Sequence, residues 1–293
     1  MRLSLLVPGG SGQLGQDLAA LANDNVDVLA PSSGELNVTS AGEVVAAVTA
    51  LATRAKATGA KPVVINAAAY TAVDAAETDE NKAFAVNADG PRVLAAVCSS
   101  RNIPLVHIST DYVFPGNATS PYEPTDPLGP QSAYGRTKAA GEDAVLSSGA
   151  RAWIVRTSWV YGKTGTNFVK TITRLEKERE TLSVVSDQHG SPTWSADLAK
   201  ALLELATRIA TGKAPSHQVL HCTGAGATTW FAFAQAIFTE LGADPTRVTP
   251  CTTADFPRPA PRPPYAVLSN KSWQKASLTP LPPWQKALKT YFK

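Results

Sequence analysis

Cysteine is scarce in this 293-residue chain, which contains Cys98, Cys222 and Cys251 only. The number is odd and no two of them form a C-x-x-C pair, which argues against a disulfide framework and against a cysteine zinc site. We therefore expect all three thiols to be small buried side chains, and we assign no metal site.

Long apolar runs and clusters of basic residues are also absent. No stretch approaches the roughly 18 consecutive apolar residues of a membrane-spanning helix, and the first apolar run is too short for a secretory signal. The 27 basic residues are scattered among 24 acidic ones, for a net charge of +3. We expect a cytoplasmic protein that binds neither membranes nor nucleic acids, with a charge that slightly favours anionic ligands.

The first half of the chain alternates short apolar runs with helical stretches. The runs include LSLLV, VDVLA, PVVINAAA and PLVHIST, and an alanine-rich helix is expected near residues 41–58. Such alternation is typical of right-handed β-α-β units, and strands that are apolar throughout indicate a parallel sheet covered on both faces. The predicted fold is α/β, a doubly wound parallel sheet of the Rossmann type.

Proline is frequent in the last fifty residues, above all in DFPRPAPRPPYAVL. Such a run cannot form a helix and is poorly suited to a central strand. A disordered linker is one interpretation. Because aromatic and aliphatic residues resume directly after it, we favour an ordered loop that lines a site.

Three glycines, Gly9, Gly12 and Gly15, have the spacing G-x-x-G-x-x-G between the first predicted strand and the helix that follows. Glycines permit a tight turn and let the backbone approach a pyrophosphate, and the start of the helix offers unpaired N–H groups and a partial positive charge. Gln13 and Leu14 would add backbone N–H groups. This junction predicts a dinucleotide site, with a purely structural glycine turn as the alternative.

The end of the second predicted strand bears on cofactor choice. NAD-selective sites usually place an acid there to bind the ribose hydroxyls. This strand ends in Ala30, Pro31, Ser32 and Ser33, with no carboxylate before Glu35 and no arginine to hold a 2′-phosphate. We expect NADPH or NADH as cofactor, with NADPH at least tolerated because nothing negative repels its extra phosphate.

Tyr134 and Lys138 lie four residues apart in SAYGRTKAAGED, where a helix is expected to begin. That spacing places both side chains on one helix face, within about 6 Å of each other. Upstream, VHISTDYVF is an apolar strand that ends in Ser109, Thr110 and Asp111, and the carboxyl end of such a strand faces the ligand crevice. A hydroxyl, a phenol and an ammonium can therefore converge. For the spacing alone, an ordinary solvated Tyr and Lys is the alternative.

Reduction of a carbonyl needs this set of groups, because it leaves an alkoxide that a general acid must protonate. We expect Thr110 to hydrogen-bond the carbonyl oxygen, Tyr134 to donate the proton and Lys138 to lower the pKa of the phenol. Lowering that pKa from about 10 to about 7 needs roughly 4 kcal/mol. One charge about 6 Å away supplies roughly 3 kcal/mol at an effective dielectric of about 20, so Lys138 alone falls slightly short.

Several segments together resemble the extended short-chain dehydrogenase/reductases: the glycine turn, NAAAYT, STDYVF, Y-x-x-x-K and RTSWVYG, in this order. Within that family the chain is most similar to the dTDP-4-dehydrorhamnose reductases, because TAVDAAE, NFVKTITRLEKERETLSVVSDQHGSPTW and FPRPAPRPPYAVLSN also look like theirs. The resemblance covers nearly the whole chain. It implies reduction of the 4-keto group of dTDP-6-deoxy-L-lyxo-4-hexulose to dTDP-L-rhamnose by NADPH or NADH.

The resemblance also implies roles for particular residues. Thr110, Tyr134 and Lys138 would be catalytic, and Thr110, Asp111 and Trp159 would contact the sugar. Cofactor contacts would come from Gly9, Gly12, Gln13, Leu14, Gly15, Asn37, Val38, Ala67, Ala68, Ala69, Tyr70, Thr71, Tyr134 and Lys138. An aromatic face such as Trp159 packs well against the C–H faces of a hexose, although a core tryptophan is the alternative. Independently, Arg258 and Arg262 in the proline-rich segment are candidates for the substrate diphosphate, with Arg262 the one we assign to substrate.

The predicted domain boundaries follow the same family resemblance. We expect a dinucleotide-binding domain over 1–162, rejoined by about 195–222, and a substrate-binding domain over 163–194 and 223–293. Some members form a dimer through a magnesium site built on glutamates. This chain has Asp17 and Asp197 near such places, so we assign no metal there, and a homodimer stays open. Ala266 stands where members often carry a serine.

Other functions are compatible with parts of this pattern. A nucleotide-sugar epimerase or dehydratase of the same fold is one, and a non-catalytic regulatory subunit, which the intact catalytic set disfavours, is another. Of the four histidines, only His189 is expected in a loop from which it could approach a ligand. His107, His217 and His221 lie in or beside predicted strands, and we expect structural roles for all four.

Overall fold

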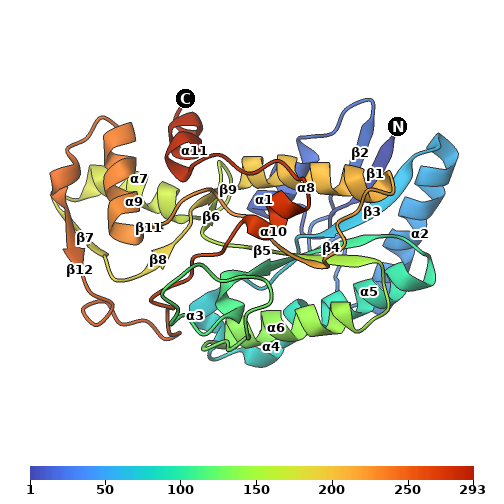
Figure 1. The fold of residues 1–293 in the computed structure, drawn as a ribbon, viewed down its shortest axis with the longest axis horizontal. Coiled ribbons are helices and arrows are strands. Elements are labelled where there is room, and N and C mark those ends of the chain that lie inside the picture. Colours follow the sequence, from blue (N-terminus) through green and yellow to red (C-terminus); the bar gives the residue numbers. More distant parts are fainter.

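A six-stranded parallel sheet forms the centre of the computed structural model, which describes residues 1–293 (Figure 1). Across the sheet the strands are β2 (Val26–Leu29), β1 (Leu3–Leu6), β3 (Lys61–Asn66), β4 (Leu105–Thr110), β5 (Ala152–Thr157) and β10 (Val219–His221). Since β2 lies on one side of β1 while β3 and β4 lie on the other, the strand order reverses between β1 and β3. The predicted doubly wound α/β fold is confirmed.

Helices cover both faces of this sheet (Figure 1). One face carries α1 (Gln13–Ala19), α8 (Ser195–Ala210) and α10 (Lys271–Lys275), and the other carries α2 (Ala41–Thr58), α5 (Gly90–Ser100) and α6 (Ala133–Leu146). Successive strand residues alternate between the two cores: Leu5 and Ile65 pack toward α1 and α8, whereas Leu6 and Val64 pack toward α2 and α5. Both faces are therefore apolar, which explains the unbroken apolar runs in the sequence.

The alanine-rich helix α2 has the bounds that the sequence predicts. It begins after Ser40, whose side chain accepts a hydrogen bond from the Glu43 N–H, and ends at Gly59 in the left-handed conformation, with φ of 67°. Serine is a preferred N-cap, and glycine takes positive φ without steric cost. Between β3 and α5 lie α3 (Val73–Ala76), α4 (Glu80–Phe84) and a π-helical turn at Ala85–Asp89.

A second, smaller core lies beside the sheet and appears at the left of Figure 1. It joins α7 (Phe168–Glu178), α9 (Trp230–Glu240) and α11 (Trp284–Tyr291) to a parallel pair of strands, β7 (Leu182–Val185) and β12 (Val248–Cys251). Two short ladders link it to the rest: β6 (Val160–Tyr161) with β9 (Thr193–Trp194), and β8 (His189–Gly190) with β11 (Thr228–Thr229). Its centre is aromatic, with Tyr161, Phe233 and Trp284 buried together.

The proline-rich segment is ordered, as expected, but none of its residues lines the main cleft of the structure, so the expectation that it lines that site is wrong. The Tyr265 N–H donates to the Gly116 carbonyl at 3.0 Å, and the His189 N–H donates to the Pro264 carbonyl at 2.8 Å. His189 is thus part of the short strand β8, so the expectation that it lies in a loop is wrong.

Two further expectations concern the cysteines and the membrane. Cys98 and Cys222 are buried, but Cys251 in β12 is half-buried, so the expectation that all three are buried holds for two of them. None of the helices combines the length and the apolar composition that crossing a bilayer requires.

Candidate active site

A cleft of about 800 Å³ opens at the carboxyl ends of β1, β3, β4 and β5. It lies where the strand order reverses, which is where doubly wound sheets bind ligands, and its volume suits a small-molecule site. The residues that line it include most of those predicted from the sequence: Gly9, Gly12, Gln13, Leu14, Gly15, Asn37, Val38, Ala67, Ala68, Ala69, Thr71, Thr110, Asp111, Tyr134, Lys138 and Trp159.

The three glycines of the first turn have different physical reasons to be glycine. Gly9 has φ of +86°, and a Cβ there would lie 2.7 Å from the Ala68 nitrogen. A Cβ on Gly15 would lie 2.2 Å from the Gly9 carbonyl oxygen, so α1 packs directly on the turn. At Gly12 the only atom within 4 Å of such a Cβ is the Gly9 oxygen, at 3.3 Å. The backbone at Gly12 is therefore open toward the cleft that it lines.

The start of α1 is suited to an anion. Gly12 is its N-cap, and no side chain caps the helix, so the first N–H groups, from Gln13 and Leu14 onward, are available to a ligand. The open backbone at Gly12 and this uncapped helix together fit the diphosphate of a dinucleotide.

The part of the cleft formed by residues that follow β2 carries no charged side chain. Ser33, Asn37 and Val38 line it, and the Glu35 carboxylate turns back to accept hydrogen bonds from the N–H and the hydroxyl of Ser32, both at 2.8 Å. Among all residues that line the cleft, Asp111 is the one acid and Lys138 the one base. The cleft therefore has neither an acid that selects NAD nor a second cation that selects NADP.

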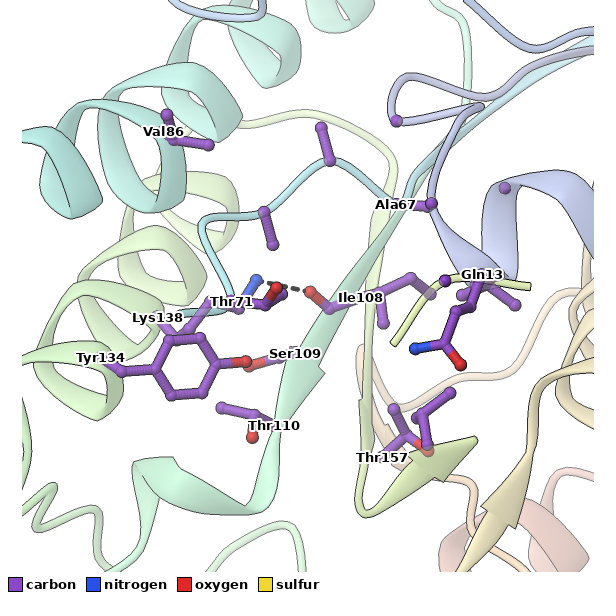
Figure 2. A pocket seen from close by; sticks show the side chains of 18 of the residues that line it. Gln13, Ala67, Thr71, Val86, Ile108, Ser109, Thr110, Tyr134, Lys138 and Thr157 are labelled. Carbon is purple, nitrogen blue, oxygen red and sulfur yellow. Dashed lines mark hydrogen bonds between the residues drawn. The ribbon is translucent and has the colours of Figure 1, made fainter. Parts of the chain in front are cut away.

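Helix α6 brings Tyr134 and Lys138 to the end of β4, as Figure 2 shows. The Ser132 hydroxyl caps this helix by accepting from the Gly135 N–H at 3.1 Å. A Cβ on Gly135 would lie 2.3 Å from the Tyr112 carbonyl oxygen, so the helix lies tightly against the segment that follows β4. This packing places the phenol beside Thr110, and the predicted convergence of the three side chains is present.

Lys138 is buried, with 2% of its surface exposed. Its Nζ donates to the Ile108 carbonyl at 2.7 Å, the bond drawn in Figure 2, and lies 3.4 Å from Nε2 of His107. Burial lowers the pKa of this amine to about 8, although the charge of Glu142 opposes the shift.

The expected effect of Lys138 on the phenol is not found. Burial raises the pKa of Tyr134 to about 12, with the Thr110 hydroxyl lowering it and the charge of Asp111 raising it further. The charge of Lys138 does not contribute to the pKa of Tyr134, and the Lys138 amine is bound to the Ile108 carbonyl. In this state the phenol keeps its proton firmly, which suits a group that donates a proton and does not suit a base.

Asp111 is buried beside Thr110. Its Oδ1 accepts the Thr110 hydroxyl hydrogen at 2.8 Å, while its Oδ2 has no partner. Burial raises the pKa of this carboxyl to about 7, against the effect of the Thr110 hydrogen bond. While that bond is made, Thr110 has no hydrogen left for a substrate carbonyl, a constraint that the sequence did not reveal.

Sequence reasoning gave no role to Ser109, Thr157 or Trp230, which also line the cleft. The Ser109 and Thr157 hydroxyls are buried without a hydrogen-bond partner. Thr157 pairs with Thr110 in the register of β4 and β5, so the matching strand ends IST and RTS could have indicated it. Trp230, from α9, stacks on Trp159 with ring centroids 3.5 Å apart and planes inclined by 9°. Nothing in the sequence brings these two tryptophans together.

Two predicted ligands lie outside the cleft lining. The ring of Tyr70 packs near Ala76, Ala83 and Ala133, and its backbone N–H and carbonyl are both held by the Asn87 amide. The motif NAAAYT places Tyr70 among the predicted cofactor contacts. Its side chain instead packs near these three alanines and does not line the cleft.

Arg262 also lies outside the cleft lining, behind Tyr112. Its Nη2 is 2.8 Å from a carboxylate oxygen of Asp74, and Arg258 lies 3.6 Å from the same carboxylate. The charge of Arg262 lowers the pKa of Tyr112, against a larger rise from burial, and Tyr112 does line the cleft. To bind a diphosphate, Arg262 must exchange Asp74 for phosphate oxygens.

None of the four histidines lines the cleft. His107 and His221 are fully buried, in agreement with structural positions. Asp17, considered above for a metal, accepts a hydrogen bond from the Ser195 hydroxyl.

Comparisons with known proteins agree with this geometry. A family model described as the RmlD substrate binding domain matches residues 1–293. A dTDP-4-dehydrorhamnose reductase of Mycobacterium tuberculosis is 47% identical over 292 residues, covering 98% of this chain and 91% of the relative. A probable dTDP-4,6-dihydroxy-2-methyloxan-3-one 4-ketoreductase of Streptomyces antibioticus is 46% identical over 290 residues, with 98% and 94% covered.

Among solved structures, a dTDP-4-dehydrorhamnose reductase of Bacillus anthracis in complex with NADP superposes with a TM-score of 0.90. It is 34% identical, and the alignment covers 100% of this chain and 99% of that one.

Proposed function

The chain belongs to the RmlD family, whose model matches its full length, and we propose on this premise that it is an NADPH- or NADH-dependent reductase. Its reaction is the reduction of the 4-keto group of dTDP-6-deoxy-L-lyxo-4-hexulose to dTDP-L-rhamnose. The observation that carries the proposal is the meeting of Tyr134, Lys138 and Thr110 with the open glycine turn in one cleft.

The cofactor, when bound, supplies the hydride for the ketone carbon. The uncapped start of α1 and the open backbone at Gly12 would hold its diphosphate. Ala67, Ala68, Ala69 and Thr71 would contact the cofactor, and Asn37 and Val38 would lie near its adenine. We assign the ribose hydroxyls to Lys138, which would exchange the Ile108 carbonyl for them.

Tyr134 donates the proton that the reduced oxygen needs. A phenol with a pKa of about 12 is protonated throughout the neutral range, and as reduction makes the substrate oxygen strongly basic, transfer from such a phenol becomes favourable. Thr110 orients the same oxygen once its hydrogen is released from Asp111. Protonation of Asp111, whose pKa is about 7, would weaken the bond that holds that hydrogen.

The sugar lies between the two cores in this proposal. Trp159 offers its ring to the hexose, Asp111 offers its unpartnered Oδ2 to a hydroxyl, and Arg262 takes the diphosphate after releasing Asp74. The residues of 163–194 and 223–293 form the substrate-binding part, and 1–162 with about 195–222 form the dinucleotide-binding part. We place the reaction in the cytoplasm, with the nucleotide sugar as the partner and no nucleic acid or membrane; a homodimer remains open.

The test is oxidation of NADPH and NADH by the purified protein with the 4-keto sugar, followed by identification of the product. We expect dTDP-L-rhamnose with either cofactor, and NADPH at least as good as NADH. Cofactor binding without oxidation would favour a regulatory subunit, and a changed sugar without net oxidation would favour an epimerase or dehydratase.

A further inference from the structure

Lys138 is in contact with a buried pair of polar side chains that the proposed reaction does not use. Asn66 ends β3 and His107 lies opposite it in β4, where the register pairs the two residues directly. The Asn66 amide nitrogen is 3.0 Å from Nδ1 of His107, and Nε2 of His107 is 3.4 Å from Nζ of Lys138. Asn66 and His107 are 1% and 0% exposed, so water does not replace these contacts.

The orientation of the Asn66 amide is fixed by a third group. The Ala68 N–H donates to Oδ1 of Asn66 at 3.1 Å. A flipped amide would set its NH₂ group against this N–H, with two donors facing each other. The oxygen of Asn66 therefore faces Ala68, and its NH₂ group faces His107.

This orientation determines the proton position on the histidine. An imidazole that accepts at Nδ1 and is neutral carries its hydrogen on Nε2. That N–H points at Lys138, where an ammonium has no lone pair to receive it. A neutral amine has one, and it can still donate to the Ile108 carbonyl at 2.7 Å.

We propose that Asn66 and His107 are positioning residues that hold Lys138 as a neutral amine in the cofactor-free protein. In this arrangement each of the three contacts joins a donor to an acceptor: Asn66 to His107, His107 to Lys138, and Lys138 to the Ile108 carbonyl. An ammonium would instead face the Nε2–H with no lone pair between the two nitrogens. Lys138 then gains its proton when ribose hydroxyl oxygens replace the Ile108 carbonyl, so cofactor binding and charging of the amine are coupled.

The charged groups around Lys138 do not reverse this preference. Glu142, one turn along α6, favours the ammonium, but it is bound by Arg156, at 2.6 Å, in a buried ion pair. Tyr134 and Asp111 face the cleft beside the amine, and burial favours the uncharged form of both. Burial also favours the neutral amine, lowering the pKa of Lys138 to about 8, so that the amine is mainly uncharged above that pH. It holds the pKa of His107 well below its usual range, so the imidazolium does not form. The other ionisable groups on the elements packed around α6 either bond elsewhere, as Glu77, Glu80, Arg136, Asp89 and Arg92 do, or are exposed to solvent, as Lys82 and Asp143 are.

The direct test is the tautomer of His107 in the cofactor-free protein, read by ¹⁵N NMR of histidine-labelled protein at about pH 9, where an amine with a pKa of about 8 is mainly neutral. The chain has four histidines, and His107→Phe identifies the resonances by their loss. We expect hydrogen on Nε2 and none on Nδ1. A hydrogen on Nδ1, or on both nitrogens, would overturn the proposal.

The second measurement is the titration of the Lys138 amine by ¹³C NMR of lysine-labelled protein, with Lys138→Met to identify its signal. Asn66→Leu and His107→Phe remove the opposing N–H, and we expect the midpoint to rise by about one pH unit, the size of shift that one hydrogen bond can cause. Thr137→Val is the matched control: Thr137 is buried next to Lys138 in the chain and bonds Asn87. Equal shifts in all three variants, or none, would contradict a role of the histidine.

The inference rests on the proposed function only in giving Lys138 the cofactor ribose. Both measurements use the free protein and no turnover, so absence of reductase activity would leave their outcome unaffected. Conversely, a wrong tautomer would leave the assignment of the reaction intact.

Discussion

Gly12→Ala should separate cofactor binding from folding. The added methyl group would lie 3.3 Å from the Gly9 oxygen and within 4 Å of no other protein atom outside its own neighbours, so the fold can accept it with a shift of a few tenths of an ångström. The methyl group would instead occupy the surface where the diphosphate approaches the uncapped start of α1. We expect the variant to fold and to bind dinucleotide weakly.

The magnitude follows from the hydrogen bonds at that surface. A hydrogen bond to a charged group contributes about 1.5–3 kcal/mol, and displacement of the diphosphate should lose at least one. The Kd for NADPH should therefore rise roughly 10- to 100-fold, as measured by calorimetry, while the unfolding temperature stays close to that of the wild type.

Two other glycines provide the comparison. Gly42→Ala, in α2, meets no atom within 4 Å and should leave the Kd unchanged. Gly15→Ala places a methyl group 2.2 Å from the Gly9 oxygen and should destabilise the fold itself. A wild-type Kd in Gly12→Ala would refute the placement of the diphosphate.

Three further outcomes follow from the structure. Arg262→Ala, which frees Asp74, should raise the KM for the nucleotide sugar far more than it lowers kcat; the opposite split in steady-state kinetics would remove Arg262 from the diphosphate site. Lys138→Met should be more stable than the wild type at pH 7 by up to about 3 kcal/mol, because burial shifts the lysine pKa from 10.5 to about 8. Between pH 8 and 10.5 the unfolded chain binds more protons than the folded one, so the stability of the wild type rises with pH. The stability advantage of the variant should therefore disappear across this range. A constant difference in the free energy of unfolding, measured by chemical denaturation, would contradict the pKa shift. Trp230→Ala should raise the KM for the sugar roughly five- to tenfold, since a stacked aromatic pair contributes about 1 kcal/mol and Trp230 supports the ring of Trp159; an unchanged KM would show that the stack does not shape the sugar site.

The sequence predicts those parts of the site that depend on local spacing. The glycine turn, the capped start of α6 and the apolar strand that ends at Thr110 are each set by a few neighbouring residues, and parallel strands bring their ends to one edge of a sheet. These constraints were sufficient for the fold class, for helix α2 and for the convergence of Tyr134 with Thr110.

Interactions between distant segments could not be predicted in the same way. The stack of Trp230 on Trp159 joins two cores, and the ion pair of Arg262 with Asp74 spans most of the chain. The pKa of Tyr134 also differs from the expectation, because burial raises it, with smaller and opposing effects from Thr110 and Asp111. Spacing along a helix indicates that two groups are near each other but not which partner each one chooses.

Tyr134→Phe measured with NADPH and the 4-keto sugar tests the central claim most directly. The variant removes one oxygen from a half-buried ring, so the Kd for NADPH should stay within a factor of about two. Single-turnover reduction should slow by roughly 10²- to 10⁴-fold, the range for loss of a general acid. Reduction at the wild-type rate with intact cofactor binding would contradict the assignment of Tyr134 as the proton donor.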